Sequence, residues 1–523
     1  MRLPAPSRVR DTCRLMLLDA NALQPGARIA TDVCVVGAGA AGITLARTLA
    51  GHGIDVALLE SGGMDFEPAT QKLADVVNRE PQYPFDGLRL RYFGGSTNHW
   101  GGWCRPFDAT DFLTRSWVSN SGWPITRADL DPYYPEALSI LDIPPRLHGA
   151  SLEQLADDIE HKPSVFGADH RDFQSLVWLQ SAPTRMRAKY RDEIRANPRI
   201  HCFLHANAME LIADANGSHV LGLKVRTLAG RESTCSAKIY VLCAGGIENA
   251  RLLLLSDTVV AGGIGNQHDL VGRYLMEHTS TSSPCWLVLA PPTGSERFQE
   301  EDVCERSRSS RLPGVKADMF GFAARPAFQR THELLACSIN AAGGPVTDRE
   351  AMPEAIRDLL GASSSPAAAI PGPRAYRIFV LAEHVPNPNS RVSLGTERDA
   401  LGQRKTVVDL QFQEQDRRSL RDSLQFFAQA LGASGRGRVQ INNGEPLTYA
   451  GGGGHDMGTT RMADDPRHGV TDRHGKVHGV DNLFLAGSSL FSTSGFANPT
   501  LTLVALTLRV ADRLKDVVRT AGG

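Results

Sequence analysis

Residues 32–63, DVCVVGAGAAGITLARTLAGHGIDVALLESGG, contain the pattern that decides the fold. The apolar run at 33–36 is typical of a short, buried parallel strand. Directly after it, Gly37, Gly39 and Gly42 form a GxGxxG turn that leads into an apolar helical segment. A strand, a glycine turn and a helix in this order predict a unit that binds a dinucleotide.

The glycines and one acidic residue have separate roles in such a unit. The first glycine permits the tight turn, the second lets backbone N–H groups approach a pyrophosphate, and the third lets the helix pack on the sheet. A second strand at 54–59 ends at Glu60, about 20 residues after the first glycine, where an acid binds ribose hydroxyls. The strands, the helix and Glu60 all lie where this motif requires them, which distinguishes it from chance matches in a chain with 50 glycines. The unit alone leaves NAD and FAD both open.

Composition places the chain among globular proteins of more than one domain. A length of 523 residues predicts two to four units, and 42% hydrophobic with 22% charged residues is close to the average for folded domains. The net charge of −1 comes without long blocks of like charge, so nothing indicates nucleic acid or an anionic membrane surface as a partner. The nine scattered cysteines lack CxxC pairs, which predicts neither a disulfide framework nor a metal site.

We expect a cytoplasmic protein. The first residues include arginines but only a very short apolar run, and no small-residue cleavage pattern follows. No segment approaches the roughly 18 apolar residues of a membrane span. A partner could still carry the chain elsewhere.

Later segments extend the predicted sheet. Residues 200–238 alternate with period two and contain turn signals, which predicts strands joined by tight turns. The apolar run at 239–243 and the run at 482–489 both predict buried strands that join the first sheet, and 501–514 predicts a closing helix. The predicted class is therefore α/β, with a Rossmann-like nucleotide-binding domain built from discontinuous segments and a second, α+β domain with an antiparallel sheet. The nucleotide-binding domain is assigned to 30–130, 195–278 and 451–523, and the second domain to 131–194 and 279–450.

Several segments between these elements have their own character. Residues 88–112 have the glycines and aromatic residues of a loop, whereas Thr126 is predicted to be the N-cap of an amphipathic helix. The irregular stretches 295–314 and 361–374 are either functional loops or plain disordered surface.

Two residues near the end of the chain are candidates for catalysis. His455 follows four glycines in GGGGHDMGTTRM, and Asn498 lies in TSGFANPTLTL where the last helix should begin. A histidine can accept a proton from a hydroxyl at neutral pH, and an amide can orient the oxygen. The alternatives are a hydrogen-bonded structural histidine and a plain helix cap.

Motifs along nearly the whole chain resemble those of the glucose/methanol/choline (GMC) flavin oxidoreductases. Besides GAGAAG and ALLESGG, the similar segments are YVLCAGGIENARLLLLS, GGSTNHWGG, LVGRYLMEH, VPNPNSRVSL, HDMGTTRM and NLFLAGSSLFSTSGFANPTLT. The HxxGTxRM form and the TNHW loop are most similar to the branch that contains pyranose 2-oxidase and glycoside dehydrogenases.

The resemblance implies FAD as the cofactor and alcohol oxidation as the reaction. The substrate hydroxyl would give its proton to His455, the carbinol hydrogen would leave as hydride to flavin N5, and Asn498 would hold the oxygen. The implied substrate is a secondary alcohol of a sugar, glycoside or other small hydroxylated metabolite. The nucleotide-binding and second domains become FAD-binding and substrate-binding domains.

The same resemblance supplies the set of residues expected around FAD. His99 aligns with a histidine that some pyranose oxidases bond covalently to the flavin, although a noncovalent role is the preferred interpretation here. The expected cofactor-binding residues are Gly37, Gly39, Ala40, Ala41, Gly42, Glu60, Ser61, Gly95, Ser96, Asn98, His99, Trp100, Ala208, Ala244, Gly245, Gly487, Asn498, Pro499 and Thr500.

Two other functions stay open beside the preferred one. Some relatives of this fold are lyases that retain FAD structurally. The chain could also be the large subunit of a dehydrogenase, so the electron acceptor could be oxygen, a quinone or a protein partner. No metal is expected.

Overall fold

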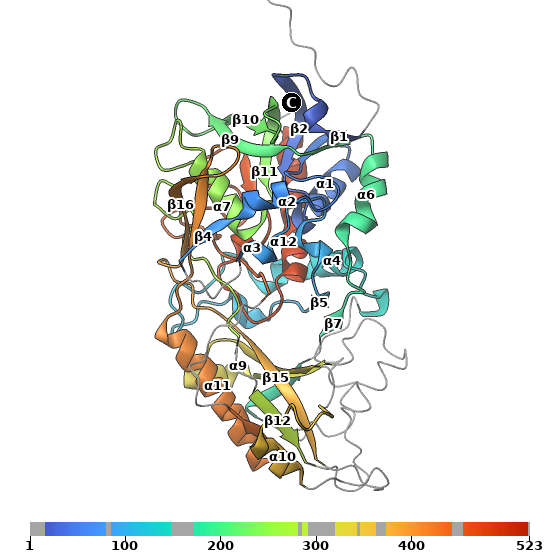
Figure 1. Ribbon diagram of the computed structural model, residues 1–523. Coiled ribbons are helices and arrows are strands. Elements are labelled where there is room, and N and C mark those ends of the chain that lie inside the picture. The colour runs from blue at the N-terminus through green and yellow to red at the C-terminus, as the bar shows by residue number, and fades with distance from the viewer. Residues whose placement is uncertain are drawn as a thin grey trace, which may run out of the picture.

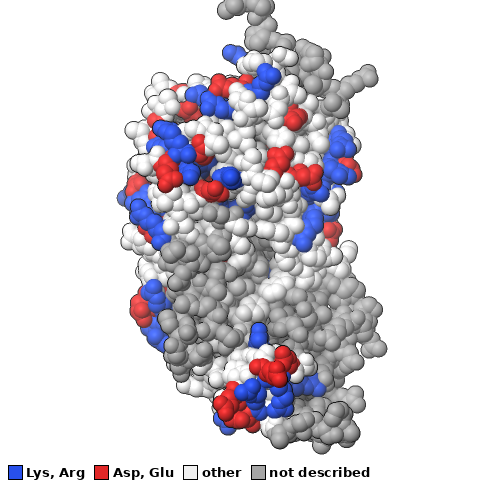
Figure 2. Space-filling model, in the orientation of Figure 1, with Lys and Arg blue, Asp and Glu red and all other residues white. Residues whose placement is uncertain are grey.

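The computed structural model has two lobes, with the early and late parts of the chain together in the upper lobe of Figure 1. Of the two irregular stretches, 295–314 and residues 362–372 of the second lie outside the described residues. On the face shown in Figure 2, basic and acidic side chains are interspersed and form no large field of one sign. The structure describes residues 16–79, 85–147, 171–176, 178–280, 285–290, 319–342, 346–361, 373–441 and 453–520.

An eight-stranded sheet forms the centre of the upper lobe. Its order is β1-β8-β3-β2-β11-β10-β9, and β19 also pairs with β11. β1, β8, β3, β2 and β11 run parallel to one another, and β19 runs parallel to β11. β9, β10 and the start of β11 form an antiparallel meander. The bounds are β1 Leu17–Asp19, β2 Ala27–Val36, β3 Val56–Leu59, β8 Ile200–Leu204, β9 Asn207–Ala213, β10 Val220–Arg226, β11 Glu232–Leu242 and β19 Leu483–Leu485.

The strands predicted at 200–243 and 482–489 belong to this sheet, as expected. β11 is one continuous strand that completes the meander at its start and lies between β2 and β19 at its end. Its last four residues are buried, and strands pair with both of its edges there. The predicted α/β class and the discontinuous sheet are therefore confirmed.

Helices from distant parts of the chain pack beside the sheet. α12 buries apolar residues at helical spacing and packs against α1 and α4, while α6 also contacts α1. α7 packs against β9 and the later strand β16. The bounds are α1 Ala40–Gly51, α2 Pro68–Gln71, α3 Phe85–Leu88, α4 Tyr134–Ile140, α6 Met186–Ala196, α7 Gly245–Leu255, α12 Thr500–Thr520 and β16 Arg391–Arg398.

The helix expected to begin at Thr126 starts later. Thr126 caps a 3-10 turn, Arg127–Asp129. The Asp129 carboxylate accepts hydrogen bonds from the backbone N–H and the hydroxyl of Thr126, at 2.7 and 2.8 Å. The α-helix itself begins at Tyr134, with Pro135 in its first turn. Proline is tolerated there because the first N–H groups of a helix need no partner within it.

A six-stranded antiparallel sheet forms the lower lobe, which confirms the predicted second architecture. Its order is β18-β12-β15-β14-β13-β6. α11, Glu414–Ala433, places Leu420, Leu424 and Phe427 in the core of this lobe. The remaining bounds are β6 Phe173–Leu176, β12 Cys285–Leu289, β13 Met319–Ala324, β14 Cys337–Ala342, β15 Arg374–Ala382, β18 Gly437–Gln440, α9 Pro326–His332 and α10 Glu354–Leu360.

Two small sheets connect segments that are distant in sequence. One has the order β16-β17-β4, and the other pairs β5 with β7. Within 131–194, β6 joins the lower sheet while α4 and α6 pack in the upper lobe, so the domain boundaries stay a prediction. The bounds are β4 Val76–Asn78, β5 Trp103–Cys104, β7 Leu179–Gln180 and β17 Arg404–Asp409.

Within the described ranges, no helix has both the length and the apolar character needed to cross a membrane.

Candidate active site

A cavity of about 770 Å³ extends from the glycine turn toward the lower sheet. Its wall includes the residues that follow β2, β3 and β11, and Gly487 after β19. Ligands of parallel sheets bind at this carboxyl edge, where loops rather than strands shape the wall.

The cavity brings together most of the residues expected around the cofactor and both catalytic candidates. Gly42 and Asn98 are absent from the wall. A Cβ at Gly42 would lie 1.8 Å from Gly37 O, so its role is to let α1 pack against the turn. Asn98 Nδ2 instead donates to Phe93 O at 3.0 Å. The expected residues on the wall are Gly37, Gly39, Ala40, Ala41, Glu60, Ser61, Gly95, Ser96, His99, Trp100, Ala208, Ala244, Gly245, His455, Gly487, Asn498, Pro499 and Thr500.

The glycine turn leaves room for a negatively charged group. Gly37 has φ +100°, a conformation that favours glycine, and a Cβ there would lie 2.8 Å from Cys243 O. A Cβ at Gly39 would meet no protein atom within 4 Å. Gly39 is also the N-cap of α1 and gives it no side-chain hydrogen bond, so the helix N-terminus can face a pyrophosphate.

Glu60 is buried and already bonded to the turn. Its Oε2 accepts from Ala38 N at 2.9 Å, and Oε1 accepts from Gly62 N at 3.0 Å and Ser61 Oγ at 3.1 Å. A carboxylate has further lone pairs, so it can still accept from ribose hydroxyls in the cavity.

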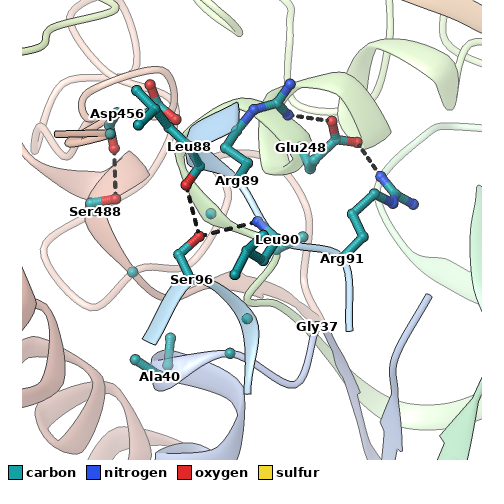
Figure 3. Close-up of a pocket in the computed structure, with 18 of the residues that line it drawn as sticks. Gly37, Ala40, Leu88, Arg89, Leu90, Arg91, Ser96, Glu248, Asp456 and Ser488 are labelled. Carbon is teal, nitrogen blue, oxygen red and sulfur yellow. Dashed lines mark hydrogen bonds and ion pairs between the residues drawn. The ribbon is translucent and has the colours of Figure 1, made fainter. Parts of the chain in front are cut away.

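A charged cluster lines another part of the wall, and sequence reasoning missed it. Arg89 and Arg91 approach Glu248 of α7 from two sides, at 2.8 and 3.2 Å (Figure 3). Arg251 lies 3.4 Å from Glu248 as well, and it also pairs with Asp399 at 2.6 Å. Burial raises the pKa of Glu248, but the three arginines together lower it to about 2. Only the cavity-facing position of these residues identifies them, because their spacing in sequence has no pattern.

Ser96 holds the segment that carries the two arginines over the cavity. Its hydroxyl donates to Leu88 O at 3.2 Å and accepts from Leu90 N at 3.3 Å (Figure 3). The first part of the loop predicted at 88–112 therefore lies along the cavity wall.

His455 and Asn498 meet on the cavity wall as expected for a catalytic pair. Asn498 Nδ2 lies 3.3 Å from His455 Nε2, and Asn498 Oδ1 is buried without a hydrogen-bond partner among the described residues. On its other side, His455 Nδ1 lies 2.9 Å from Nδ1 of His278, a residue that sequence reasoning did not select. Burial and the neighbouring His278 lower the pKa of His455 well below its usual value. His455 is therefore neutral at pH 7 and can accept a proton.

The loop residues near His455 differ in their exposure. Trp100 Nε1 donates to Thr184 O at 2.8 Å, which holds its ring, whereas part of His99 is exposed. Partial burial lowers the pKa of His99. A covalent bond from His99 to the cofactor stays an open prediction.

Aromatic side chains line the part of the cavity beside the lower sheet. The rings of Trp103 and Phe379 lie 5.6 Å apart, and Trp178 lies 6.1 Å from Trp103. Trp103, Phe379, Leu381 and Ser280 are on the wall. None was predicted, although Trp103 lies only a few residues beyond the TNHW loop.

These residues fit FAD. The open space at Gly39, the uncapped N-terminus of α1 and the lone pairs of Glu60 match a pyrophosphate and a ribose, and the cavity continues from them to His455.

Comparison with known proteins supports this fit. A family model described as GMC oxidoreductase matches residues 386–507, and one described as an FAD binding domain matches residues 30–69. The 6'''-hydroxyparomomycin C oxidase of Streptomyces lividus is 26% identical over 94% of this chain and 92% of its own length. The fructose dehydrogenase large subunit of Gluconobacter japonicus is 24% identical over 93% of this chain and 98% of its own.

Solved structures share the fold. A pyridoxine 4-oxidase from Mesorbium loti superposes with a TM-score of 0.55 at 18% identity, over 92% of this chain and 99% of its own. A formate oxidase superposes with a TM-score of 0.58 at 17% identity, over 95% and 99%.

Proposed function

Because the chain belongs to the GMC oxidoreductases and binds FAD, we propose that it oxidises a secondary alcohol of a sugar, glycoside or similar small metabolite to a carbonyl. The observation that carries this proposal is the contact of 3.3 Å between Asn498 Nδ2 and His455 Nε2, in the cavity that also contains the glycine turn. A general base beside an oxygen-orienting amide is suited to removing a hydroxyl proton.

In the proposed reaction, two side chains act on the substrate hydroxyl. His455 Nε2 takes the proton, and the Asn498 amide donates to the oxygen as negative charge grows on it. Bound FAD supplies the two-electron acceptor that takes the carbinol hydrogen as hydride. The proton must leave as the hydride leaves, since an alkoxide is a far better hydride donor than an alcohol.

The cofactor and substrate would occupy different parts of the cavity. We place the diphosphate at Gly37 and Gly39 and the ribose at Glu60, as the glycine turn and its acid favour. The substrate then lies toward Trp103 and Phe379. The domain boundaries predicted from sequence are kept within this proposal.

A sugar-like substrate has two supports. Trp103 and Phe379 offer broad apolar faces against which the C–H face of a sugar ring can pack, while polar groups at His455 set its orientation. The relatives include an enzyme named for a hydroxyparomomycin and another named for fructose.

A second candidate is a dehydrogenase that passes electrons to a protein partner. The relative named as a fructose dehydrogenase large subunit favours it. The two candidates share the same alcohol oxidation and differ only in the electron acceptor. Comparing oxygen consumption with dye reduction on one substrate separates them.

An anaerobic screen of sugars, glycosides and simpler secondary alcohols tests the main proposal. Bleaching of the oxidised flavin absorbance, with stoichiometric carbonyl product, is the expected result. A flavin that stays oxidised with every alcohol, while the protein converts a substrate without net oxidation, would instead show a lyase.

A further inference from the structure

We propose that His278 is a positioning residue that fixes the tautomer of His455, so that the Nε2 lone pair of His455 faces the substrate hydroxyl. The proposal rests on the proposed function, in which His455 is the base. His278 lies on the segment between α7 and β12, far from His455 in sequence, and its side chain does not line the cavity.

The direction of the hydrogen bonds follows from a backbone carbonyl at one end. His278 Nε2 lies 3.1 Å from Ser494 O, which can only accept, so Nε2 of His278 must carry a proton. In a neutral ring the Nδ1 atom is then an acceptor. This Nδ1 lies 2.9 Å from Nδ1 of His455, which must therefore donate. The remaining ring nitrogen of His455, Nε2, is left with its lone pair.

The contact between Asn498 and His455 agrees with this tautomer of His455. Asn498 Nδ2 is a donor, and it lies 3.3 Å from His455 Nε2, where only an unprotonated nitrogen can accept. Turning the Asn498 amide would suit the opposite tautomer at this end. That tautomer would leave two unprotonated Nδ1 atoms facing each other between the rings, because His278 must keep its proton on Nε2 to donate to Ser494 O.

Burial keeps His278 in the neutral form that this assignment needs. Its exposure is 1%, and burial lowers its pKa to about 4. Glu277 is buried beside the pair, with Oε1 at 3.9 Å from His455 Nδ1 and at 3.1 Å from the backbone N of His278. The same carboxylate can stabilise His455 once it has taken the substrate proton.

Two substitutions separate this role from a merely structural one. His278→Asn can place Oδ1 close to the position of Nδ1 and so keep an acceptor, whereas His278→Leu fills similar space without one. Both lose the donor to Ser494 O. With a substrate from the anaerobic screen, we expect His278→Leu to slow flavin bleaching by about 10²–10³-fold, since general base catalysis contributes about that much. KM should change little, and His278→Asn should recover at least about tenfold of the loss.

A second measurement reads the tautomer directly and does not require a substrate. In holoenzyme labelled with ¹⁵N-histidine, long-range proton–nitrogen spectra distinguish protonated from unprotonated ring nitrogens, and His455→Ala identifies the signals of His455. The expected parent spectrum shows His455 protonated at Nδ1 and unprotonated at Nε2. His278→Leu should give a mixture of tautomers.

The outcomes are decisive in both directions. A parent spectrum with the proton on His455 Nε2, or equal bleaching rates for the leucine and asparagine variants, would overturn the proposal. If no alcohol bleaches the parent flavin, the proposed function fails, while the spectrum still decides the tautomer. If the leucine variant does not fold, the parent spectrum alone decides it.

Discussion

The side-chain amide of Asn498 contacts the imidazole of His455, with Nδ2 at 3.3 Å from Nε2. The Oδ1 atom of Asn498 is buried without a hydrogen-bond partner among the described residues. A substrate hydroxyl that enters this corner can give its proton to the histidine and accept from the amide. Asn498 thus supplies a place for the oxygen as well as a donor to it.

Replacing the base should abolish the reductive step while FAD stays bound. We expect His455→Ala to slow anaerobic flavin bleaching by about 10²–10⁴-fold, because the imidazole that contacts the Asn498 amide is the proposed proton acceptor. The matched control is His468→Ala. His468 is an exposed histidine that follows the GTTRM segment. Stopped-flow absorbance measures both, and a parent-like rate in His455→Ala would refute the assignment.

A negative charge in place of Asn498 should shift the pH profile. In Asn498→Asp a carboxylate faces His455 Nε2 and favours the imidazolium, so the pKa of His455 should rise from its depressed value. The acidic limb of kcat/KM should therefore move to higher pH. Asn498→Ala is the control, because it should lower kcat by about 10²-fold without that upward shift. An identical limb in parent and Asn498→Asp would contradict the contact.

Removing the acid at the end of β3 should release the cofactor. Glu60→Ala leaves Ala38 N and Gly62 N without their acceptor, which should cost about 1.5–3 kcal/mol of folding stability besides the lost ribose contact. Glu60→Gln keeps one carbonyl acceptor and should retain more FAD. Flavin content after gel filtration and thermal unfolding measure the two effects. Full FAD retention in Glu60→Ala would exclude the ribose role.

Stability should fall in mild acid because of His278. Its pKa is about 4 in the folded protein and near 6.5 when unfolded, so the unfolded chain binds the proton first as the pH falls. The free energy of unfolding should decline by up to ~3 kcal/mol between about pH 6.5 and 4. His278→Asn should show a shallower decline over the same window, measured by urea unfolding. Parallel pH profiles for parent and variant would contradict the low pKa.

A buried ion pair joins the loop at Arg115 to Glu383, the residue that directly follows β15. Arg115 donates to both oxygens of Glu383, at 2.7 and 2.5 Å, and both side chains are buried. Arg115→Met leaves a buried, unpaired carboxylate and should cost about 3–5 kcal/mol.

Two controls define that effect. Adding Glu383→Gln to Arg115→Met should recover part of the loss, because the unpaired charge is then removed. Arg467→Met, at an exposed pair, should leave the unfolding midpoint unchanged. Denaturant unfolding of the set measures the coupling, and additive losses would show that the pair is not coupled.

The sequence identified the parts of the site that local pattern determines. The glycine turn, Glu60 and the strand before them follow from spacing, because each must act within one βαβ unit. His455 and Asn498 needed the family resemblance, since nothing in their spacing shows that they touch. Their contact nevertheless agrees with that expectation.

What the sequence could not supply depends on packing between distant segments. Glu248 lies on the wall together with Arg89 and Arg91, which pair with it from a segment distant in sequence. His278 lies in LVGRYLMEH, a segment that was recognised only as a family motif, and its relation to His455 appears only when the chain is folded. The predicted start of the helix near Thr126 is wrong, because a capping signal fits a 3-10 turn as well as an α-helix.

The order of strands in the central sheet also sets when the protein can become active during synthesis. β11 lies between β2 and β19 at its carboxyl end, so the edge of the sheet beside the cofactor is completed by residues 483–485. Such pairing between distant segments is slow to form and exposes strands until it does. A nascent chain that has not yet released β19 and α12 from the ribosome therefore lacks Asn498 and a finished cofactor pocket. The complete cofactor pocket forms only once these residues have folded onto the sheet.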